Sequence, residues 1–288
     1  QVVSAVVSVV SNGVKMKTSY KYEGLKVNLE GLGSLGFSKV ITENSLSKIK
    51  TVNTFNQNYP YIGTTSKNMS YLQGELVSEV DHEYSSTYKN STYQIQTPLQ
   101  TSKSYENGVL LKTTTTQNSN FDSFGNTKTI ISTITDETTG DVFTKTANNT
   151  YTNDTSSWIL ARLTNAEVID EAYGDTQTKT SSFTYDTQTG ILKTEIIEPT
   201  NTKWLKKSYT YDRYGNKIKE LVSGADITSR STTTTYDPLG KFALKVTNAL
   251  GHTQTNEYNQ DGQVLKVTSP NGLVTSFLYD SFGKKIQE

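Results

Sequence analysis

Aspartate recurs along the second half of the chain, and paired carboxylates are the groups that support acid–base chemistry such as glycoside hydrolysis. The recurring residues follow a tyrosine and precede a glycine, and asparagine replaces aspartate once. They are Asp186, Asp212, Asp237, Asn259 and Asp280. A residue type that returns in every repeat is typical of a turn, where its side chain accepts hydrogen bonds from the backbone. We therefore interpret these carboxylates as structural residues and not as a catalytic pair.

The two histidines are the other residues that could act as bases or metal ligands. His82 lies between two carboxylates in Asp81-His82-Glu83. Neighbouring residues on a strand point to opposite faces, so these three side chains are not expected to converge on a metal. His252 follows Gly251 and is expected to be a solvated turn residue.

Other signatures of chemistry are missing from the sequence. The chain contains no cysteine, which excludes disulfides and thiolate metal sites. No Walker, Rossmann, zincin or nucleophile-elbow pattern occurs. The sequence therefore predicts no catalytic, cofactor-binding or metal-binding residues, and a protein that is not an enzyme.

The aspartates belong to a repeated unit that begins with tyrosine. The units read YDTQTG, YDRYGN, YDPLGK, YNQDGQ and YDSFGK, and their first residues are 26, 25, 22 and 21 positions apart. Their tyrosines are Tyr185, Tyr211, Tyr236, Tyr258 and Tyr279, and their glycines are Gly190, Gly215, Gly240, Gly262 and Gly283. A variant, FDSFGN, occupies Phe121–Asn126. Recurrence of this kind is the signature of a repeat protein.

Each unit has the composition of a β-hairpin. Alternating segments such as Ser208–Tyr211 precede the turns and indicate strands. Aspartate starts the turn, and glycine adopts the positive φ of a type I turn with a G1 bulge. Return strands are expected at Lys217–Val222, Phe242–Val246 and Val264–Val267, with weaker turns at Asn248–Gly251 and Ser269–Gly272. Each repeat thus holds two strands, expected to be about 7–9 residues long. The tyrosine ring is expected to cross the neighbouring hairpin while its hydroxyl reaches water or a backbone carbonyl.

The composition also favours strands. The chain has 46 Thr, 30 Ser and 18 Tyr, and only 33% of its residues are hydrophobic. These residues suit a wide sheet with two partly hydrated faces. We predict an all-β fold, a continuous antiparallel hairpin-repeat sheet that forms a strongly curved or spiral strip. Residues 1–72 are expected to start the sheet, residues 73–182 to form degenerate hairpin repeats, and residues 183–288 to form regular repeats.

The charge pattern narrows the range of partners. Lysine and arginine number 28, aspartate and glutamate number 28, and no basic stripe is present, so nucleic acid is not an expected partner. The segment Gln1–Val10 is too short to span a membrane and is expected to be a strand. Because glutamine stands at position 1 in place of methionine, we expect the chain to be a piece of a larger protein.

The YD units resemble those of RHS-repeat proteins: B and C components of bacterial insecticidal toxin complexes, polymorphic RHS toxins and animal teneurins. The N-terminal part resembles the start of the repeats in B components, at Tyr20–Tyr22, Leu35–Phe37 and Pro60–Gly63. Tyr151–Leu163 resembles another family segment, anchored by Trp158 and Arg162, although Ala161 stands where the family often has glycine.

The resemblance implies a β-sheet shell around a toxic C-terminal polypeptide. Its partners would be the remainder of the shell, the enclosed toxin and other toxin-complex subunits, and the protein would be secreted or lie at the bacterial cell surface. The aspartyl self-cleaving core of complete family members is not found in this sequence. Asp237-Pro238 superficially resembles part of it, but it is in register with the other turns and is interpreted as a turn.

A second function stays open at this point. Exposed tyrosines and threonine hydroxyls could make the sheet an extracellular adhesion or carbohydrate-binding module with glycans as partners. Clustered exposed aromatics and saturable sugar binding would distinguish that module from a shell wall.

Overall fold

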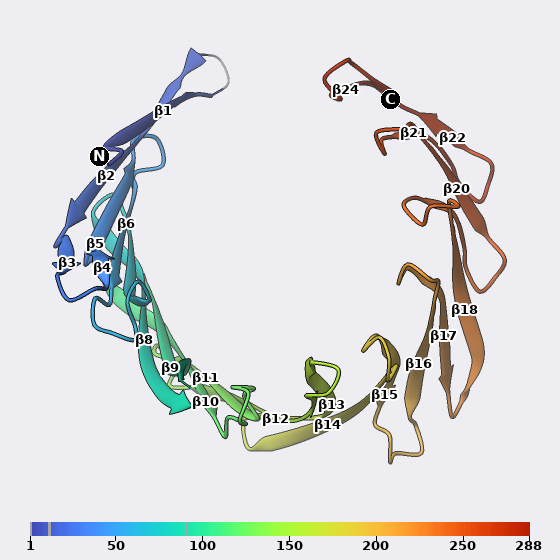
Figure 1. The fold of residues 1–288 in the computed structure, drawn as a ribbon, viewed down its shortest axis with the longest axis horizontal. Helices are drawn as coiled ribbons and strands as arrows, with labels where there is room; N and C mark the ends of the chain where they lie inside the picture. The colour runs from blue at the N-terminus through green and yellow to red at the C-terminus, as the bar shows by residue number, and fades with distance from the viewer. Residues whose placement is uncertain (1, 11–12, 90) are drawn as a thin grey trace. The chain divides into compact units, whose positions relative to one another are not determined.

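The computed structural model describes residues 2–10, 13–89 and 91–288, and these residues form an all-β protein (Figure 1). The strands are β1 (Ala5–Val9), β2 (Lys15–Glu23), β3 (Lys26–Asn28), β4 (Gly33–Gly36), β5 (Lys39–Asn44), β6 (Ile49–Phe55), β7 (Thr65–Leu72), β8 (Glu75–Lys89), β9 (Thr92–Glu106), β10 (Val109–Ser119), β11 (Thr129–Asp136), β12 (Val142–Asp154), β13 (Ile159–Ala172), β14 (Asp175–Tyr185), β15 (Leu192–Ile197), β16 (Leu205–Tyr211), β17 (Lys217–Gly224), β18 (Ile227–Tyr236), β19 (Ala243–Thr247), β20 (Thr253–Tyr258), β21 (Val264–Thr268), β22 (Val274–Ser276), β23 (Leu278–Tyr279) and β24 (Lys285–Gln287).

Twenty of these strands belong to one sheet, and β3–β4 and β23–β24 form two small hairpins beside it. The continuous antiparallel hairpin sheet predicted from the sequence is therefore confirmed. The opening segment contains β1, as expected, while Gln1 lies outside the described residues. No helix in the described part of the chain is long and apolar enough to cross a membrane.

The chain divides into two compact units. Unit 1 comprises Gln1–Asn149 and Glu167–Thr178, and unit 2 comprises Thr150–Ala166 and Lys179–Glu288. In unit 1, β1 pairs with β2, β2 with β5, and each strand from β5 to β11 with the next one along the chain. In unit 2 the same rule holds from β14 to β22. Consecutive hairpins therefore extend the sheet in both units.

The sheet has almost no buried core. Among the described residues only Leu35 and Val52 are buried, each 6% exposed, and no polar side chain is buried. The chain exposes 18472 Å² of surface, whereas a compact monomer of its mass exposes about 12,000 Å². Within the residues that the structure describes, no second layer covers the sheet, so the strands are held by their hydrogen-bond ladders and by contacts between neighbouring side chains.

The strand lengths differ between the two units. Strands in the regular repeats are 5–10 residues long from β16 to β21, but β8 and β9 each have 15 residues. The length of 7–9 residues predicted for strands of the YD repeats is confirmed for β16 and β17. It is wrong for β18, which has 10 residues, and for β19, β20 and β21, which have 5, 6 and 5. The turn after β9 contains only Asn107 and Gly108, both with positive φ, and Gln73-Gly74 and Tyr173-Gly174 are similar. A two-residue turn joins the two strands directly, so that the backbone hydrogen bonds between them continue to the ends of both strands.

Candidate functional site

The YD turns are built around one aspartate oxygen. In the turn after β16, Asp212 Oδ1 accepts hydrogen bonds from the backbone N–H groups of Tyr214 at 2.8 Å and Asn216 at 2.9 Å. Two backbone bonds close the turn, from Gly215 N to the Asp212 carbonyl at 3.2 Å and from Asp212 N to the Asn216 carbonyl at 3.0 Å. Gly215 has a φ of 86°. Loss of solvent raises the pKa of Asp212, but the hydrogen bonds from Asn216 and Tyr214 outweigh it, so the pKa lies below its usual value.

The same backbone bonds recur at other turns, with small changes in length. They close the turns at Asn259–Gln263 and Asp280–Lys284, and the turn at Asp237 is one residue longer because Phe242 supplies the carbonyl. Three further turns have this geometry without a YD dipeptide, and they start at Asp122, Asn248 and Ser269. The glycine at the fourth position has positive φ in all of them. The YD unit is thus one version of a more general turn.

A longer turn of the same kind begins at Asp186. Its glycine, Gly190, donates to the Asp186 carbonyl at 2.9 Å, and Asp186 N donates to the Ile191 carbonyl at 2.8 Å. The ion pair with Lys193 and the hydrogen bonds from Thr189 and Gln188 hold the pKa of Asp186 well below its usual range. The turn from Asp136 to Asp141 repeats this geometry, with Gly140 as its glycine.

A tryptophan takes the glycine position in one related turn. Asp154 Oδ1 accepts hydrogen bonds from the N–H groups of Ser156 at 2.9 Å and Ser157 at 3.2 Å, and from the Ser156 hydroxyl. These bonds lower the pKa of Asp154 to about 2, with the Ser156 hydroxyl contributing most. Four residues after the aspartate, Trp158 has a φ of 54° and is 74% exposed. A bulky residue is strained in this conformation.

Several repeat tyrosines tie one hairpin to an earlier one. The hydroxyls of Tyr185, Tyr258 and Tyr279 donate to the backbone carbonyls of Leu163, Ala243 and Val264 at 2.8, 3.1 and 2.9 Å. The other two repeat tyrosines, Tyr211 and Tyr236, end β16 and β18. Each of these tyrosine hydroxyls thus satisfies a backbone carbonyl on the neighbouring strand.

Each repeat tyrosine also lies opposite an irregularity in the return strand. In unit 2 the register shifts between the tyrosine and the residue before it in all five YD hairpins. Thr210 pairs with Lys219 whereas Tyr211 pairs with Lys217, so Ile218 has no partner of its own. A bulge of this type bends the strand and increases its twist. The sequence pattern alone did not indicate it.

A cluster of charges crosses three strands in unit 1. The carboxylate of Glu79 on β8 lies 3.2 Å from the Nζ atoms of both Lys67 on β7 and Lys103 on β9, and it accepts a hydrogen bond from the Tyr105 hydroxyl at 3.2 Å. Partial burial raises the pKa of Glu79, but the hydrogen bonds from the two lysines outweigh it and keep the pKa below its usual value. The cluster acts as a cross-strand clamp and leaves no unpaired charge for chemistry.

The histidines lie apart from this clamp. The ring of His82 stacks on Tyr84 at 6.2 Å, and Asp81 pairs with Lys67 at 3.2 Å. His252 is exposed in its turn, where its N–H donates to Asn248. No group of three metal-ligating side chains occurs within the residues described.

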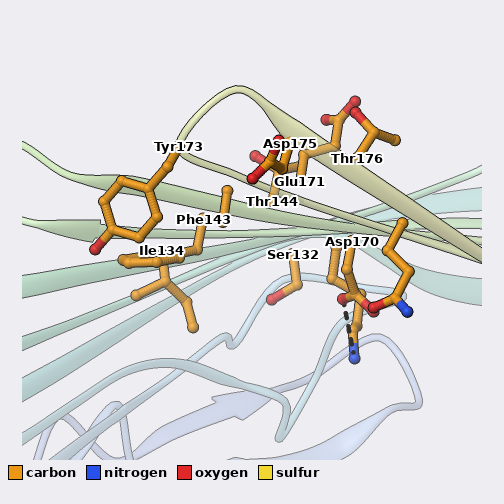
Figure 2. A pocket seen from close by; sticks show the side chains of 12 residues that line it. Ser132, Ile134, Phe143, Thr144, Asp170, Glu171, Tyr173, Asp175 and Thr176 are labelled. Atoms are coloured by element: carbon orange, nitrogen blue, oxygen red, sulfur yellow. Dashed lines mark ion pairs between the residues drawn. The ribbon is translucent and has the colours of Figure 1, made fainter.

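An open groove of about 550 Å³ in unit 1 combines apolar and polar side chains that could receive a ligand (Figure 2). Its apolar part consists of Ile134, Phe143 and Tyr173, and the rings of Phe143 and Tyr173 meet edge to face with centroids 5.3 Å apart. Its polar part includes Asp170, which pairs with Lys145 at 3.2 Å, together with Glu171 and Asp175. Tyr173 lies at the tip of the β13–β14 turn and is 75% exposed.

The turns, ties and pairing order define a protein built from antiparallel β-hairpin repeats on an uncovered sheet. Residues 258–287 match the family model described as RHS Repeat, and this segment holds the last two YD turns. Residues 258–287 therefore match an RHS-type repeat, in agreement with the resemblance of the YD units. No curated protein matches the sequence.

Solved structures extend the likeness to the whole fold. The chain is similar to the crystal structure of TcdB2-TccC3 without its hypervariable C-terminal region, with a TM-score of 0.70, 9% identity, and coverage of 95% of this chain and 21% of that one. A second crystal structure, of TcdB2-TccC3, gives a TM-score of 0.69 with 9% identity and coverage of 95% and 22%. The chain thus shares its fold with about a fifth of these much longer chains.

Proposed function

We propose that this chain is a wall segment of an RHS-type shell that encloses a toxic polypeptide, and that its role is structural and not catalytic. The observation that carries the proposal is the uncovered sheet. Of the described residues only Leu35 and Val52 are buried, while consecutive strands pair with each other from β5 to β12 and from β14 to β22. A globular enzyme or binding domain of this length would bury a core. A wall only requires that neighbouring strands stay joined. The backbone hydrogen bonds between strands and the hydrogen bonds of the repeat tyrosines join them.

The likeness to TcdB2-TccC3 supports the same proposal, because it extends over 95% of the chain. The remainder of such a shell, the enclosed polypeptide and other toxin-complex subunits would be the partners. We propose that the assembled protein is secreted or lies at the bacterial cell surface.

Limited proteolysis of the intact native protein that contains this chain tests the proposal. We expect a polypeptide that follows the repeats to resist protease while the wall is folded, and to be cut rapidly when the wall is opened. The variant Gly240→Val is designed to open it, because a Cβ at Gly240 would overlap the Tyr214 ring. Exposed Tyr173→Ser serves as the control. Equal cleavage of the intact protein and of the isolated polypeptide would contradict enclosure.

The groove supports one alternative, a glycan-binding sheet. Its exposed Tyr173 ring, supported by Phe143 and flanked by the carboxylate of Asp175, combines the stacking surface and acceptor groups that sugars use. Saturable binding on a glycan array that is lost in Tyr173→Ala would favour this alternative. Absence of binding to any arrayed glycan would remove it.

A further inference from the structure

The groove at the tip of the β13–β14 hairpin carries more negative than positive charge. The carboxylates that line it are those of Asp170, Glu171 and Asp175. Lys145 is the only cation among the lining residues, and its Nζ already lies 3.2 Å from the Asp170 carboxylate. The side chains of Glu171 and Asp175 form no ion pair or hydrogen bond with the residues that the structure describes. Two negative charges are therefore left without a partner in this part of the chain.

An exposed aromatic ring stands beside these charges. The Tyr173 ring is 75% exposed and meets Phe143 edge to face (Figure 2). This contact holds the Tyr173 ring in place, so a ligand does not bear the full entropic cost of ordering it. Over the described residues, no lysine or arginine lies above the Tyr173 ring, although five other rings carry such a cation. An open aromatic face, which attracts cations, is therefore available.

The chain itself shows how arginine uses a tyrosine ring. Cζ of Arg213 lies 4.7 Å from the centroid of the Tyr214 ring, and Cζ of Arg162 lies 5.8 Å from the centroid of the Tyr185 ring. A guanidinium group is planar, stacks on rings and donates two parallel hydrogen bonds to one carboxylate. An ammonium group is a compact point charge without this shape. A groove with an open ring and unpaired carboxylates therefore fits arginine better than lysine.

We propose that this groove binds the arginine side chain of a partner polypeptide, with the guanidinium over the Tyr173 ring and hydrogen-bonded to Asp175. The methylene groups of the arginine lie along the apolar part of the groove, at Ile134 and Phe143. The groove volume of about 550 Å³ is within the range of about 300–1,000 Å³ that is usual for small-ligand sites. It is thus large enough for one such side chain.

Asp170 can contribute to the same site. Both side chains of its ion pair with Lys145 are more than half exposed, and exposed pairs of this kind are weak. A carboxylate also accepts hydrogen bonds from more than one donor. A neutral sugar would leave Glu171 and Asp175 uncompensated, so the charge of the groove favours a cation over a glycan. The inference does not depend on the shell function.

Fluorescence anisotropy with two labelled peptides tests the proposal on the intact native protein that contains this chain. One peptide carries arginines separated by glycine and serine, and the other carries citrulline at the same positions, which has nearly the same shape but no charge. We expect saturable binding of the arginine peptide and a dissociation constant at least about tenfold higher for the citrulline peptide. The affinity should fall as salt is added, because exposed charges are screened. No binding, or equal binding of both peptides, would overturn the proposal.

Charge variants locate the binding site. Asp175→Asn removes the carboxylate and is expected to raise the dissociation constant of the arginine peptide about threefold to fivefold. Glu137→Gln is the matched control, because it removes one negative charge from the exposed β11–β12 turn, and Glu137 does not line the groove. This control should bind the arginine peptide as the parent protein does. Equal losses in the two variants would mean that overall charge alone attracts the peptide, and would contradict a site at the groove.

Ring variants test the aromatic contact. Tyr173→Asn removes the ring, and asparagine tolerates the φ of 53° at this position, so the turn should stay folded. We expect the dissociation constant of the arginine peptide to rise about threefold. Tyr173→Phe keeps the ring and should bind like the parent protein. Unchanged affinity in Tyr173→Asn would overturn the ring contact. Saturable binding of a neutral sugar that the arginine peptide does not displace would assign the groove to a glycan and contradict the proposal.

Discussion

The hydroxyl of Tyr258 donates a 3.1 Å hydrogen bond to the carbonyl oxygen of Ala243, the first residue of β19, and its ring stacks on Phe242 with centroids 5.0 Å apart and planes 19° from parallel. One side chain thus links the end of one hairpin to the start of the previous return strand. Links of this kind matter in a sheet without a covering layer, because no core holds the hairpins together.

Removing only the hydroxyl should measure the link itself. Tyr258→Phe keeps the ring stack on Phe242 but leaves the Ala243 carbonyl without this donor. We expect the free energy of unfolding to fall by about 0.5–1.5 kcal/mol, the usual net value of one hydrogen bond. Denaturant titration measures the change. Tyr173→Phe, at a 75% exposed residue, is the control and should have little effect.

The two glycines of neighbouring YD turns should respond differently to asparagine. Gly215 has a φ of 86°, and a Cβ there would meet only Ile191 at an ordinary 3.7 Å. Gly240 has a φ of 68°, and a Cβ there would overlap the Tyr214 ring. Asparagine tolerates positive φ, so Gly215→Asn should cost less than about 1 kcal/mol and Gly240→Asn clearly more. Gly215→Val should also cost more, because a β-branched residue tolerates positive φ poorly.

Thermal unfolding of these variants checks the turn geometry. Equal losses for Gly215→Asn and Gly240→Asn would contradict the close approach of the Tyr214 ring. An unchanged melting temperature for Gly215→Val would contradict the left-handed backbone conformation assigned to this turn.

Trp158 allows the opposite substitution, in which a bulky residue with positive φ is replaced by glycine. It holds a φ of 54° at the position that glycine occupies in the turns at Asp136 and Asp186. Trp158→Gly should therefore stabilise the chain by about 1 kcal/mol, through relief of backbone strain. Trp158→Ala removes the exposed ring but keeps a Cβ, so it should recover little of that gain. A loss of stability in Trp158→Gly would show that contacts of the indole ring outweigh the strain.

The Asp154 turn predicts a specific response to acid. The hydrogen bonds from Ser156 and Ser157 lower the pKa of Asp154 to about 2 in the folded chain, compared with about 3.9 in an unfolded one. A carboxyl with a depressed pKa contributes stability above its unfolded pKa and loses it as the pH falls through the folded pKa. The contribution should thus be complete above about pH 4 and disappear toward pH 2.

Unfolding midpoints between pH 5 and pH 2 measure this contribution. The variant Asp154→Asn should be less stable than the parent chain at pH 5, and the difference should shrink as the pH approaches 2. A constant difference over this range would mean that the charge of Asp154 does not matter to the turn.

The repeat pattern was sufficient to predict the hairpins, because turn chemistry is local. An aspartate that caps backbone N–H groups and a glycine with positive φ leave a readable spacing, and β16–β17 and β20–β21 lie where that spacing puts them. The strand at Phe242–Val246 was displaced by one residue, because Phe242 supplies the carbonyl that closes the longer turn at Asp237.

Other structural features were not predicted, because they leave a weaker pattern in the sequence or none at all. Asn107-Gly108 is a strong hairpin dipeptide that could have been recognised, whereas Tyr173 and Trp158 are residue types that no rule places at positive φ. The register shifts at the repeat tyrosines were not predicted from the spacing of the repeat, although they occur in all five YD hairpins. The groove at Phe143 and Tyr173 arises from residues 30 positions apart and has no sequence pattern of its own.

Small-angle X-ray scattering of the chain tests the central claim most directly, that this protein is a single-layer wall and not a closed globule. A compact domain of 288 residues has a radius of gyration of about 19 Å. We predict a clearly larger value, because almost no described side chain is buried in a core. A value near 19 Å would contradict the wall and indicate a closed globular fold.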